Sequence, residues 1–424
     1  MTHDDRARDI TKSAREAARA LANAPTKTKD RVLRRVAEAL RDEAVQARVT
    51  EANALDLEAG QAAGLSEAML DRLRLDDKRL EALAKSLDEI AALPDPVGRI
   101  DELVARPSGI QVGRMKVPLG VILIVYESRP NVTVDAAALC LKAGNAVILR
   151  GGKEAANSNR ALAHVVAEAL EAERLPKDAA LLVDDPEREL LYALLRRSGE
   201  IDLAIPRGGT GLIAAVNEHA RVPVVQHYQG ICHVYVHEAA DLDVAERIVV
   251  NAKVQRPGVC NALECLVVDE KIAPAFLPRV IAALKQRGVE IRADDKAQKL
   301  AGARAQDLVA ATPKDFDTEF LSLTIALKVV SGYEEAVRFI SEHGSNHTES
   351  ILTKDHDVAM RFLREVDASC VLVNASTRFN DGGALGLGAE LGISTTKLHA
   401  YGPMGLEELC TRKFIVLGHG EVRE

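Results

Sequence analysis

The chain has 424 residues, of which 28% are charged and 47% hydrophobic, and its formal net charge is −8. This length exceeds what one hydrophobic core serves and predicts two or three domains. The acidic balance, without a basic block, argues against nucleic acid as a partner. No apolar run of about 18 residues is present, so we expect no membrane span.

The cysteines argue against a metal site. Six of them are scattered along the chain, without the close spacing that a zinc site requires. We therefore expect no bound metal. The N-terminus is charged and lacks the apolar segment of a secretion signal. A reducing cytoplasm is the expected location.

The first part of the chain is predicted to be helical. Residues 1–92 are rich in Ala, Leu, Arg and Glu and predict several helices, which end near Leu93-Pro94-Asp95-Pro96. Residues 109–120 have Gly and Pro at their bends and predict a short hairpin.

The rest of the chain alternates between apolar runs and helical patterns. Near-continuous apolar strands separated by helices predict βαβ units and parallel sheets covered on both faces. The first set comprises strands 121–126, 146–149, 180–183, 201–205, 223–226 and 232–236, with helices 134–141, 159–170, 187–196 and 210–219. The second set begins after Cys260 and comprises strands 262–268, 323–330, 350–353 and 369–373, with helices 274–286, 334–341 and 358–366, and strand 414–417 closes the chain.

Cys260 lies on a bend where a thiol could face a cleft. It follows the amphipathic helix 242–252 and precedes the apolar strand 262–268, and Pro257 and Gly258 interrupt the chain just before it. The alternative is a small buried thiol that only packs, which is the commoner fate of a cysteine.

Two loops that follow strands predict a nucleotide site. Arg150-Gly151-Gly152-Lys153 offers cations and close backbone approach, and Arg207-Gly208-Gly209 opens a helix whose first amides can bind phosphate. Neither matches the G-x-G-x-x-G fingerprint, and each alone could be an ordinary β-to-α turn. Together they make Arg150, Lys153, Arg207, Gly208 and Gly209 our candidate cofactor-binding residues.

The stretch 373–390 is a candidate substrate loop. It begins directly after a strand and contains small hydroxyls, an arginine and many glycines, including Ser376 and Arg378. A carboxylate or phosphate group would find hydrogen-bond donors here. The alternative is a flexible surface loop.

Several stretches together resemble one family. They are VPLGVILIVYESRPNVTVDAAALCLKAGNAVILRGGKEA (117–155), IPRGGTG (205–211), NAKVQRPGVCN (251–261), EHGSNHTESI (342–351), VNASTRFNDGGALGLGAE (373–390) and KLHAYGPMGLEEL (397–409). These stretches, and the order in which they occur, resemble the gamma-glutamyl phosphate reductase (glutamate-5-semialdehyde dehydrogenase) family of the aldehyde dehydrogenase superfamily.

The resemblance implies an activity and an α/β architecture. The activity is the NADPH-dependent reduction of L-glutamyl 5-phosphate to L-glutamate 5-semialdehyde with release of phosphate, the second step of proline biosynthesis. The architecture is aldehyde dehydrogenase-like. It comprises a Rossmann-like cofactor domain (1–106 and 120–236), an α/β catalytic domain (237–395) and a small β oligomerisation arm (107–119 and 396–424).

The same resemblance implies roles for individual residues. Cys260 would be the nucleophile that forms a thioester, and its own N–H with Asn131 would stabilise the oxyanion. Glu319 would hold the nicotinamide ribose. Lys153 stands where NAD-preferring relatives carry a glutamate, and a lysine there would attract the 2′-phosphate of NADP.

For the substrate carboxylate, the candidates are Arg378 and Ser376, followed by His347 and Arg129. Where hydrolytic aldehyde dehydrogenases place a glutamate base, residues 222–233 read VPVVQHYQGICH and contain no carboxylate. A base there would hydrolyse the thioester, so its absence argues for reduction. We assign no role to His227 and Tyr228 beyond shaping the cleft.

Two rival functions are a hydrolytic or coenzyme-A-acylating aldehyde dehydrogenase, and a protein that keeps the fold without catalysis. The missing carboxylate argues against the first, and the joint presence of Cys260, Lys153 and Glu319 argues against the second. As partners we expect a small-molecule substrate, further copies of the chain in a homo-oligomer, and transient contact with a separate glutamate 5-kinase.

Overall fold

The computed structural model describes residues 1–225 and 229–423. The chain divides into two compact units. Unit 1 comprises residues 1–226, 386–392 and 404–424, and unit 2 comprises residues 227–385 and 393–403. The predicted strand at 223–226 and the residues His227 and Tyr228 fall wholly or partly outside the described residues.

Unit 1 contains a parallel sheet in the order β5-β4-β3-β6. Its central strand, β3, is buried along its whole length, as its continuous apolar sequence VILIVY predicts. The strands are β3 (Val121–Tyr126), β4 (Ala146–Gly151), β5 (Ala180–Leu182) and β6 (Leu203–Arg207). The helices of unit 1 are α1 (His3–Leu21), α2 (Thr26–Arg41), α3 (Glu43–Ala62), α4 (Glu67–Leu73), α5 (Asp77–Ala92), α6 (Asn131–Lys142), α7 (Ala156–Ala172), α8 (Arg188–Leu195) and α9 (Thr210–His219).

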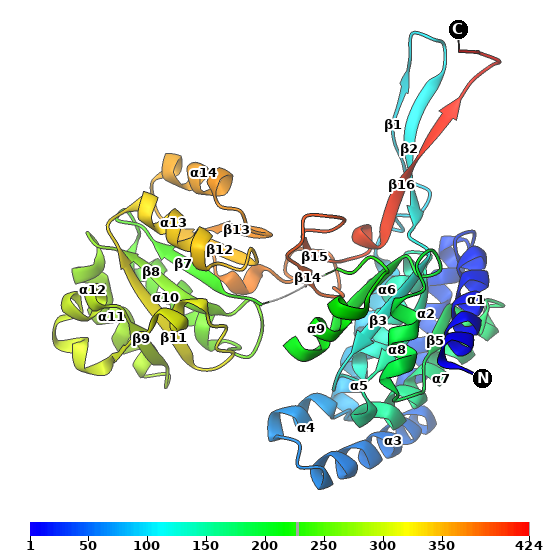
Figure 1. The fold of residues 1–424 in the computed structure, drawn as a ribbon, viewed down its shortest axis with the longest axis horizontal. Coiled ribbons are helices and arrows are strands. Elements are labelled where there is room, and N and C mark those ends of the chain that lie inside the picture. The colour runs from blue at the N-terminus through cyan, green and yellow to red at the C-terminus, as the bar shows by residue number, and fades with distance from the viewer. Residues whose placement is uncertain (226–228, 424) are drawn as a thin grey trace. The chain divides into compact units, whose positions relative to one another are not determined.

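Unit 1 also carries an antiparallel arm of β1 (Ile100–Ala105), β2 (Gln111–Pro118) and β16 (Cys410–Leu417), which extends away from the helices of the unit (Figure 1). The predicted hairpin within 109–120 is wrong, because these residues form a single strand whose partner is β1. The hairpin turn lies at 106–110 and uses Gly109 at a φ of +94°. The sequence of β1, IDELVA, is mostly exposed and mixes charged with apolar residues, so its pattern was uninformative.

Unit 2 contains a parallel sheet in the order β10-β9-β11-β8-β7-β12-β13. Its strands are β7 (Cys232–Val236), β8 (Leu263–Asp269), β9 (Glu290–Ala293), β10 (Val309–Ala310), β11 (Thr324–Val330), β12 (Thr348–Leu352) and β13 (Cys370–Val373), and a separate antiparallel pair is formed by β14 (Ile393–Ser394) and β15 (Gly402–Pro403). Its helices are α10 (Leu242–Val254), α11 (Ala273–Lys285), α12 (Asp295–Leu300), α13 (Tyr333–His343) and α14 (His356–Glu365).

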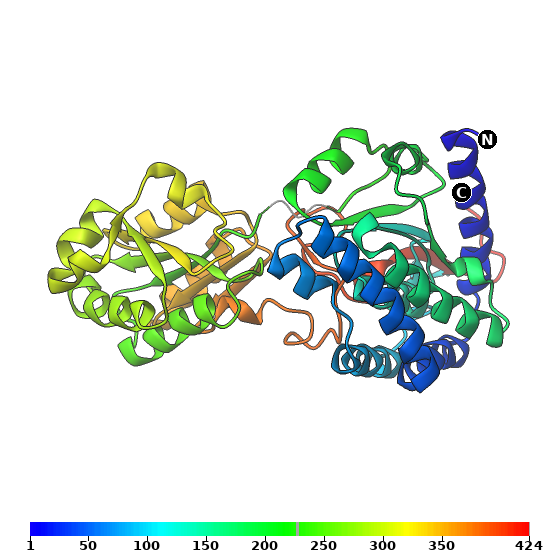
Figure 2. The same ribbon diagram turned by 90° about the horizontal axis from the view of Figure 1, so that it is seen from below.

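Helices cover both faces of the unit 2 sheet (Figure 2). The side chains of alternate residues along each strand point to opposite faces of the sheet. Val234 and Leu266 pack in the core with α10 and α11, whereas Tyr235 and Val267 pack in the core with α13 and α14. This arrangement confirms the predicted α/β fold with parallel sheets. Within the described residues, no helix is both long and apolar enough to cross a membrane.

Candidate active site

The cofactor-site candidates of unit 1 lie at the carboxyl edge of its sheet. The chain passes from β3 to β4 and β5, then returns to β6 on the other side of β3. In open α/β sheets, ligands bind at the carboxyl ends of the strands where the order reverses in this way. Arg150 is the penultimate residue of β4, Lys153 opens the short 3₁₀ helix that follows this strand, and Arg207 ends β6.

Gly208 and Gly209 form the turn from β6 into α9. The N–H of Gly209 donates to a carboxylate oxygen of Glu127 at 3.0 Å. A side chain on Gly208 would collide with this glutamate, because its Cβ would lie 2.4 Å from Glu127 Oε2. The amide at the start of α9 therefore already faces an anion. Glu127 was missed by the sequence analysis, although its position directly after β3 could have indicated it.

Arg150 and Glu154 are both engaged within the β4 loop. Arg150 donates to the carbonyl of Pro186 at 2.8 Å, and burial lowers the pKa of its guanidinium. One oxygen of Glu154 accepts from the N–H of Ser128 at 2.6 Å and from its hydroxyl at 2.8 Å. Lys153 is exposed. In this loop the carboxylate is held by hydrogen bonds of the protein and the lysine extends into solvent.

Arg129 lies in the turn between β3 and α6, and Asn131 opens α6, at the same edge of the unit 1 sheet. Asn131 is the first residue of α6, and its side-chain amide donates to Asp135 at 3.0 Å. Burial raises the pKa of Asp135 to about 6, against the opposing effects of Asn131 and Arg207. An asparagine amide has two hydrogens, so one remains for a ligand.

The candidates of unit 2 lie at the amino edge of its sheet. Cys260 precedes β8, Glu319 precedes β11 and His347 precedes β12. Because β11, β8, β7 and β12 are consecutive in the sheet, the segments that enter them are neighbours. The structure thus brings together residues that are far apart in the sequence.

Cys260 lies in the loop between α10 and β8 (residues 255–262), called the Cys260 loop or thiol loop below, and its main chain is fixed from one side. A Cβ on Gly230 would lie 2.0 Å from the carbonyl oxygen of Cys260, so only glycine fits there. The thiol of Cys232 also approaches this oxygen, at 3.1 Å. Cys260 itself is half-buried. The loop thus holds the backbone of Cys260 firmly and leaves its side chain partly accessible.

Glu319 is linked to the Cys260 loop through Gly230. The N–H of Gly230 lies close enough to the Glu319 carboxylate to lower its pKa. Burial raises the pKa of Glu319, and the Gly230 amide and the charge of Lys253 act in the opposite direction. Gly230 therefore contacts Cys260 with its α-carbon and Glu319 with its amide.

The segment after β13 returns along β12 to the same edge. The carbonyl of Ala375 accepts from Ser350 at 2.8 Å, and the amide of Asn380 donates to Thr348 at 2.7 Å. This path carries Ser376 and Arg378 towards the amino edge. The side chain of Ser376 caps the short 3₁₀ helix Thr377–Phe379.

Arg378 lies beside the Cys260 loop. Its Nε donates to the side chain of Gln255 at 2.8 Å. Burial lowers the pKa of Arg378, and the Cys260 thiol is among the groups that oppose this effect. His347 is fully buried, with its Nδ1 2.6 Å from the hydroxyl of Thr348 and 3.6 Å from the sulfur of Cys232. Of the substrate candidates of unit 2, Arg378 contacts the Cys260 loop through Gln255, and His347 is linked to the Cys260 backbone through Cys232. Arg129 belongs to unit 1.

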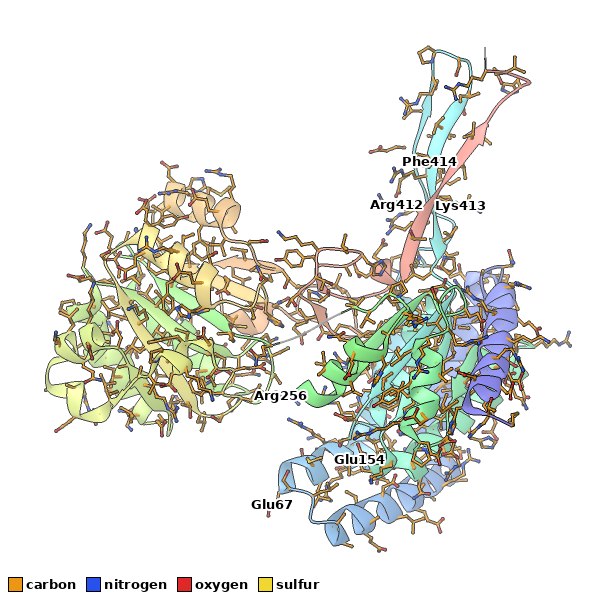
Figure 3. All side chains as sticks on the ribbon, in the orientation of Figure 1. Glu67, Glu154, Arg256, Arg412, Lys413 and Phe414 are labelled. Carbon is orange, nitrogen blue, oxygen red and sulfur yellow. The ribbon has the colours of Figure 1, made fainter. Side chains whose placement is uncertain are left out.

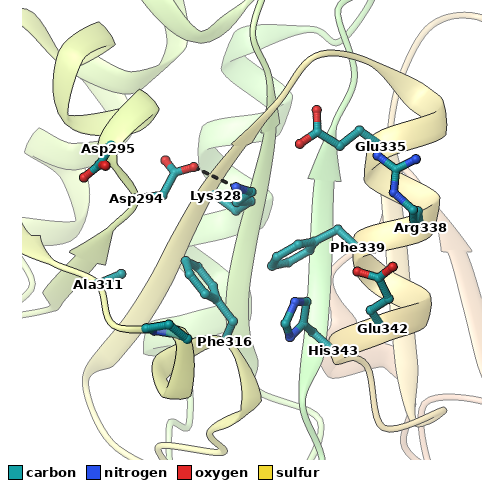
Figure 4. A pocket seen from close by; sticks show the side chains of 11 residues that line it. Asp294, Asp295, Ala311, Phe316, Lys328, Glu335, Arg338, Phe339, Glu342 and His343 are labelled. Atoms are coloured by element: carbon teal, nitrogen blue, oxygen red, sulfur yellow. Dashed lines mark ion pairs between the residues drawn. The ribbon is translucent and has the colours of Figure 1, made fainter.

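A cavity of about 500 Å³ opens elsewhere in unit 2, at the carboxyl ends of β9, β10 and β11. Figure 4 shows its side chains, including the ion pair between Lys328 and Asp294 at 3.0 Å. It contains none of the predicted site residues. Within the described residues, no group of three or more His, Cys, Asp or Glu side chains could hold a metal ion.

Comparison with known proteins identifies the class. The sequence profile of the aldehyde dehydrogenase family matches residues 2–307. The chain therefore belongs to the aldehyde dehydrogenase family, as the thiol loop and the two α/β units indicate. A solved acetylating aldehyde dehydrogenase from Geobacillus thermoglucosidasius has the same fold, with a TM-score of 0.71 and 20% identity over 100% of this chain and 98% of that one.

More similar relatives point to one branch of the family. The chain is 53% identical over its whole length to the gamma-glutamyl phosphate reductase of Geobacter metallireducens, which it covers completely. It is 56% identical to the enzyme of that name from Sorangium cellulosum, over 98% of this chain and 97% of that one. The crystal structure of the Thermotoga maritima gamma-glutamyl phosphate reductase matches with a TM-score of 0.95 and 44% identity, over 99% of this chain and 100% of that one.

Proposed function

We propose that this enzyme reduces L-glutamyl 5-phosphate to L-glutamate 5-semialdehyde with NADPH and releases phosphate, in proline biosynthesis. The observation that supports it most directly is the half-buried thiol of Cys260, whose backbone is fixed by Gly230 and whose loop contacts Arg378 through Gln255. The full-length similarity to enzymes named gamma-glutamyl phosphate reductase suggests the same substrate.

The proposed chemistry uses Cys260 twice. Its thiolate attacks the acyl carbon of the substrate, the C–S bond forms and the bond to phosphate breaks, which leaves a thioester and inorganic phosphate. When bound, NADPH would supply the hydride that reduces this thioester. The tetrahedral oxyanion is stabilised by the Cys260 N–H, and we propose Asn131 as the second donor. Collapse of this species breaks the C–S bond, releases the aldehyde and restores the thiolate.

The protein groups fit NADP. We propose that Arg150, Arg207, Gly208 and Gly209 hold its phosphates, because the arginines supply positive charge and the two glycines open α9. Phosphate binding at this turn requires the carboxylate of Glu127 to release the Gly209 N–H, to which it is bonded in this structure. Lys153 would attract the 2′-phosphate. The nearby carboxylate of Glu154, which would repel that phosphate, is held by Ser128 instead. Glu319 would bind the nicotinamide ribose, and Arg378, Ser376, His347 and Arg129 the substrate.

We propose further that unit 1 without its arm forms the cofactor domain and that unit 2, whose sheet includes β7 (Cys232–Val236), forms the catalytic domain. The predicted bounds 1–106, 120–236 and 237–395 differ from this, because β1 belongs to the arm and β7 pairs with β8 and β12. We also propose that the arm serves assembly into a homo-oligomer in the cytoplasm. The arm supports this role because it exposes apolar side chains, namely Ile100, Leu103, Val104, Phe414, Val416 and Leu417. Figure 3 shows the side chains of Arg412, Lys413 and Phe414 along β16. A transient contact with glutamate 5-kinase is tested by a pull-down at moderate salt, and loss of the kinase in the wash would argue against it.

The reverse reaction tests the proposed function. Glutamate semialdehyde and NADP are incubated with and without inorganic phosphate, and NADPH formation is followed for the wild type and Cys260→Ser. We expect phosphate-dependent turnover that the variant loses. Equal oxidation without phosphate would identify a hydrolytic enzyme, and wild-type turnover by Cys260→Ser would remove the thiol from the mechanism.

A further inference from the structure

A buried ion pair lies directly behind the Cys260 loop. Lys253, near the end of α10, and Glu264, at the start of β8, approach to 2.6 Å, and their side chains are only 0% and 1% exposed. Cys260 lies between them in the sequence. Taking two charges out of water is costly, and such a pair is often no more stabilising than apolar residues of similar volume. Its presence at this point suggests a role besides stability.

Glu264 also holds a neighbouring segment. Its second oxygen accepts from the N–H of Leu321 at 3.2 Å. Leu321 has a φ of +52°, which non-glycine residues adopt only at a cost. Its carbonyl oxygen faces the Cys260 loop, since a Cβ on Gly258 would lie 3.8 Å from it. The hydrogen bond to Glu264 therefore helps to keep Leu321 in a strained conformation against the thiol loop.

The same connections return to Cys260 through Glu319. Glu319 is two residues before Leu321, and its carboxylate lies near the N–H of Gly230, which lowers its pKa. Gly230 in turn packs on the backbone of Cys260. Lys253 and Glu264 thus lie behind a closed set of contacts. Glu264 contacts Leu321 in segment 319–321, Gly230 lies between this segment and Cys260, and Lys253 pairs with Glu264.

We propose that the Lys253–Glu264 pair positions Glu319 relative to Cys260. It would keep a fixed distance between the Glu319 carboxylate, which would hold the cofactor ribose, and the nucleophilic thiol of Cys260. This inference rests on the proposed function for the roles of Glu319 and Cys260. Both partners act through other residues and are therefore positioning residues. Hydride transfer requires close alignment, and a displacement of about 1 Å reduces turnover by about 100-fold.

Two double variants separate positioning from stability. Lys253→Met/Glu264→Leu replaces the pair by apolar groups and leaves Leu321 without its acceptor. Lys253→Met/Glu264→Gln is equally uncharged but keeps an amide oxygen for the Leu321 N–H. Double replacement avoids the isolated buried charge that would unfold a single variant.

We expect both double variants to unfold at a denaturant concentration close to that of the wild type. In the reverse reaction, Lys253→Met/Glu264→Leu (the Met/Leu variant) should show a KM for NADP raised about tenfold and a kcat lowered up to about 100-fold. Lys253→Met/Glu264→Gln (the Met/Gln variant) should have KM and kcat values much closer to those of the wild type. The matched control is Lys328→Met, which breaks an ion pair of the same sheet at the cavity of Figure 4 and should leave both constants unchanged.

The rate at which iodoacetamide alkylates Cys260 gives a second measurement that does not depend on turnover. It should differ between the wild type and the Met/Leu variant. Wild-type KM and kcat in the Met/Leu variant, or equal impairment of the Met/Leu and Met/Gln variants, would overturn the inference. If the wild type itself shows no phosphate-dependent turnover, the proposed function fails. In that case the positioning role of the Lys253–Glu264 pair is tested by the alkylation rates alone, and equal rates in the wild type and the Met/Leu variant would contradict this role.

Discussion

Gly230 permits a direct test of how the thiol is held. In Gly230→Ala, the new methyl carbon would lie 2.0 Å from the carbonyl oxygen of Cys260, 2.8 Å from its carbonyl carbon and 2.9 Å from its α-carbon. All three neighbours are backbone atoms, so no side chain can rotate away to make room. The substitution must therefore move either the Cys260 loop or the segment that contains Gly230.

The size of this movement follows from the contact distances. Optimal separations between non-bonded heavy atoms are about 3.5 Å, so the overlap with the carbonyl oxygen exceeds about 1 Å. A nucleophile displaced by about 1 Å loses about 100-fold in turnover. Overpacking of this kind also costs about 1–3 kcal/mol of unfolding free energy. We expect Gly230→Ala to fold and to lose most of its kcat.

The assay is the phosphate-dependent reverse reaction, combined with iodoacetamide alkylation of the thiol. Gly258→Ala is the matched control, because its Cβ would meet only the carbonyl oxygen of Leu321, at an ordinary 3.8 Å. This control should retain kcat within about threefold. Wild-type kcat in Gly230→Ala would refute the argument that Gly230 fixes the position of Cys260.

Three other predictions concern unit 1. Lys153→Glu should lower the preference for NADP over NAD by about 10–100-fold, measured as the ratio of kcat/KM values, because a carboxylate repels the 2′-phosphate; an unchanged ratio would contradict the role of Lys153. Burial raises the pKa of Asp135 from its ordinary value to about 6, so the folded protein holds this proton more tightly than the unfolded chain, and stability is lost as the pH rises through about 6. The wild type should lose unfolding free energy between pH 5 and pH 8, and Asp135→Asn should lose about 1–2 kcal/mol less over this range, since Asp135 is only half-buried. Denaturant titrations at both pH values measure this difference, and an equal loss in the variant and the wild type would contradict the role of Asp135. Phe414 is 66% exposed on strand β16 of the arm, and Phe414→Asp should lower the mass measured by light scattering. The same change at Leu398 should not, because this residue is 87% exposed but lies in unit 2, away from the strands β1, β2 and β16; an unchanged mass for Phe414→Asp would argue against assembly through these strands.

Much of the fold follows from local patterns in the sequence. Continuous apolar runs such as VILIVY and LECLVVD predict strands buried on both faces, and β3 and β8 have this environment. The helices between them confirm the parallel arrangement. Strands with weaker patterns were missed. The short strand β9 has the sequence EIRA, whose charged residues conceal its place inside the sheet.

The candidate site was only partly visible in the sequence. The bend at Pro257-Gly258 indicated that Cys260 could be accessible, and the structure leaves it half-buried. The Lys253–Glu264 ion pair could not be predicted, since a lysine on a helix and a glutamate on a strand are usually exposed. The position of Glu127 directly after β3 could have indicated a place at the carboxyl edge, but only the structure shows that its carboxylate accepts from the Gly209 N–H.

The sequence by itself determined the strongly apolar strands and the helices between them, that these strands form parallel sheets, and which cysteine lies on a bend, because periodicity and turn residues act over a few neighbouring positions. The tertiary structure alone decided that Gly230 packs on Cys260 and that Glu264 holds Leu321. These contacts depend on the order β11-β8-β7-β12, which places the segments entering adjacent strands side by side. That order results from the packing of the whole sheet, and no short stretch of the chain encodes it.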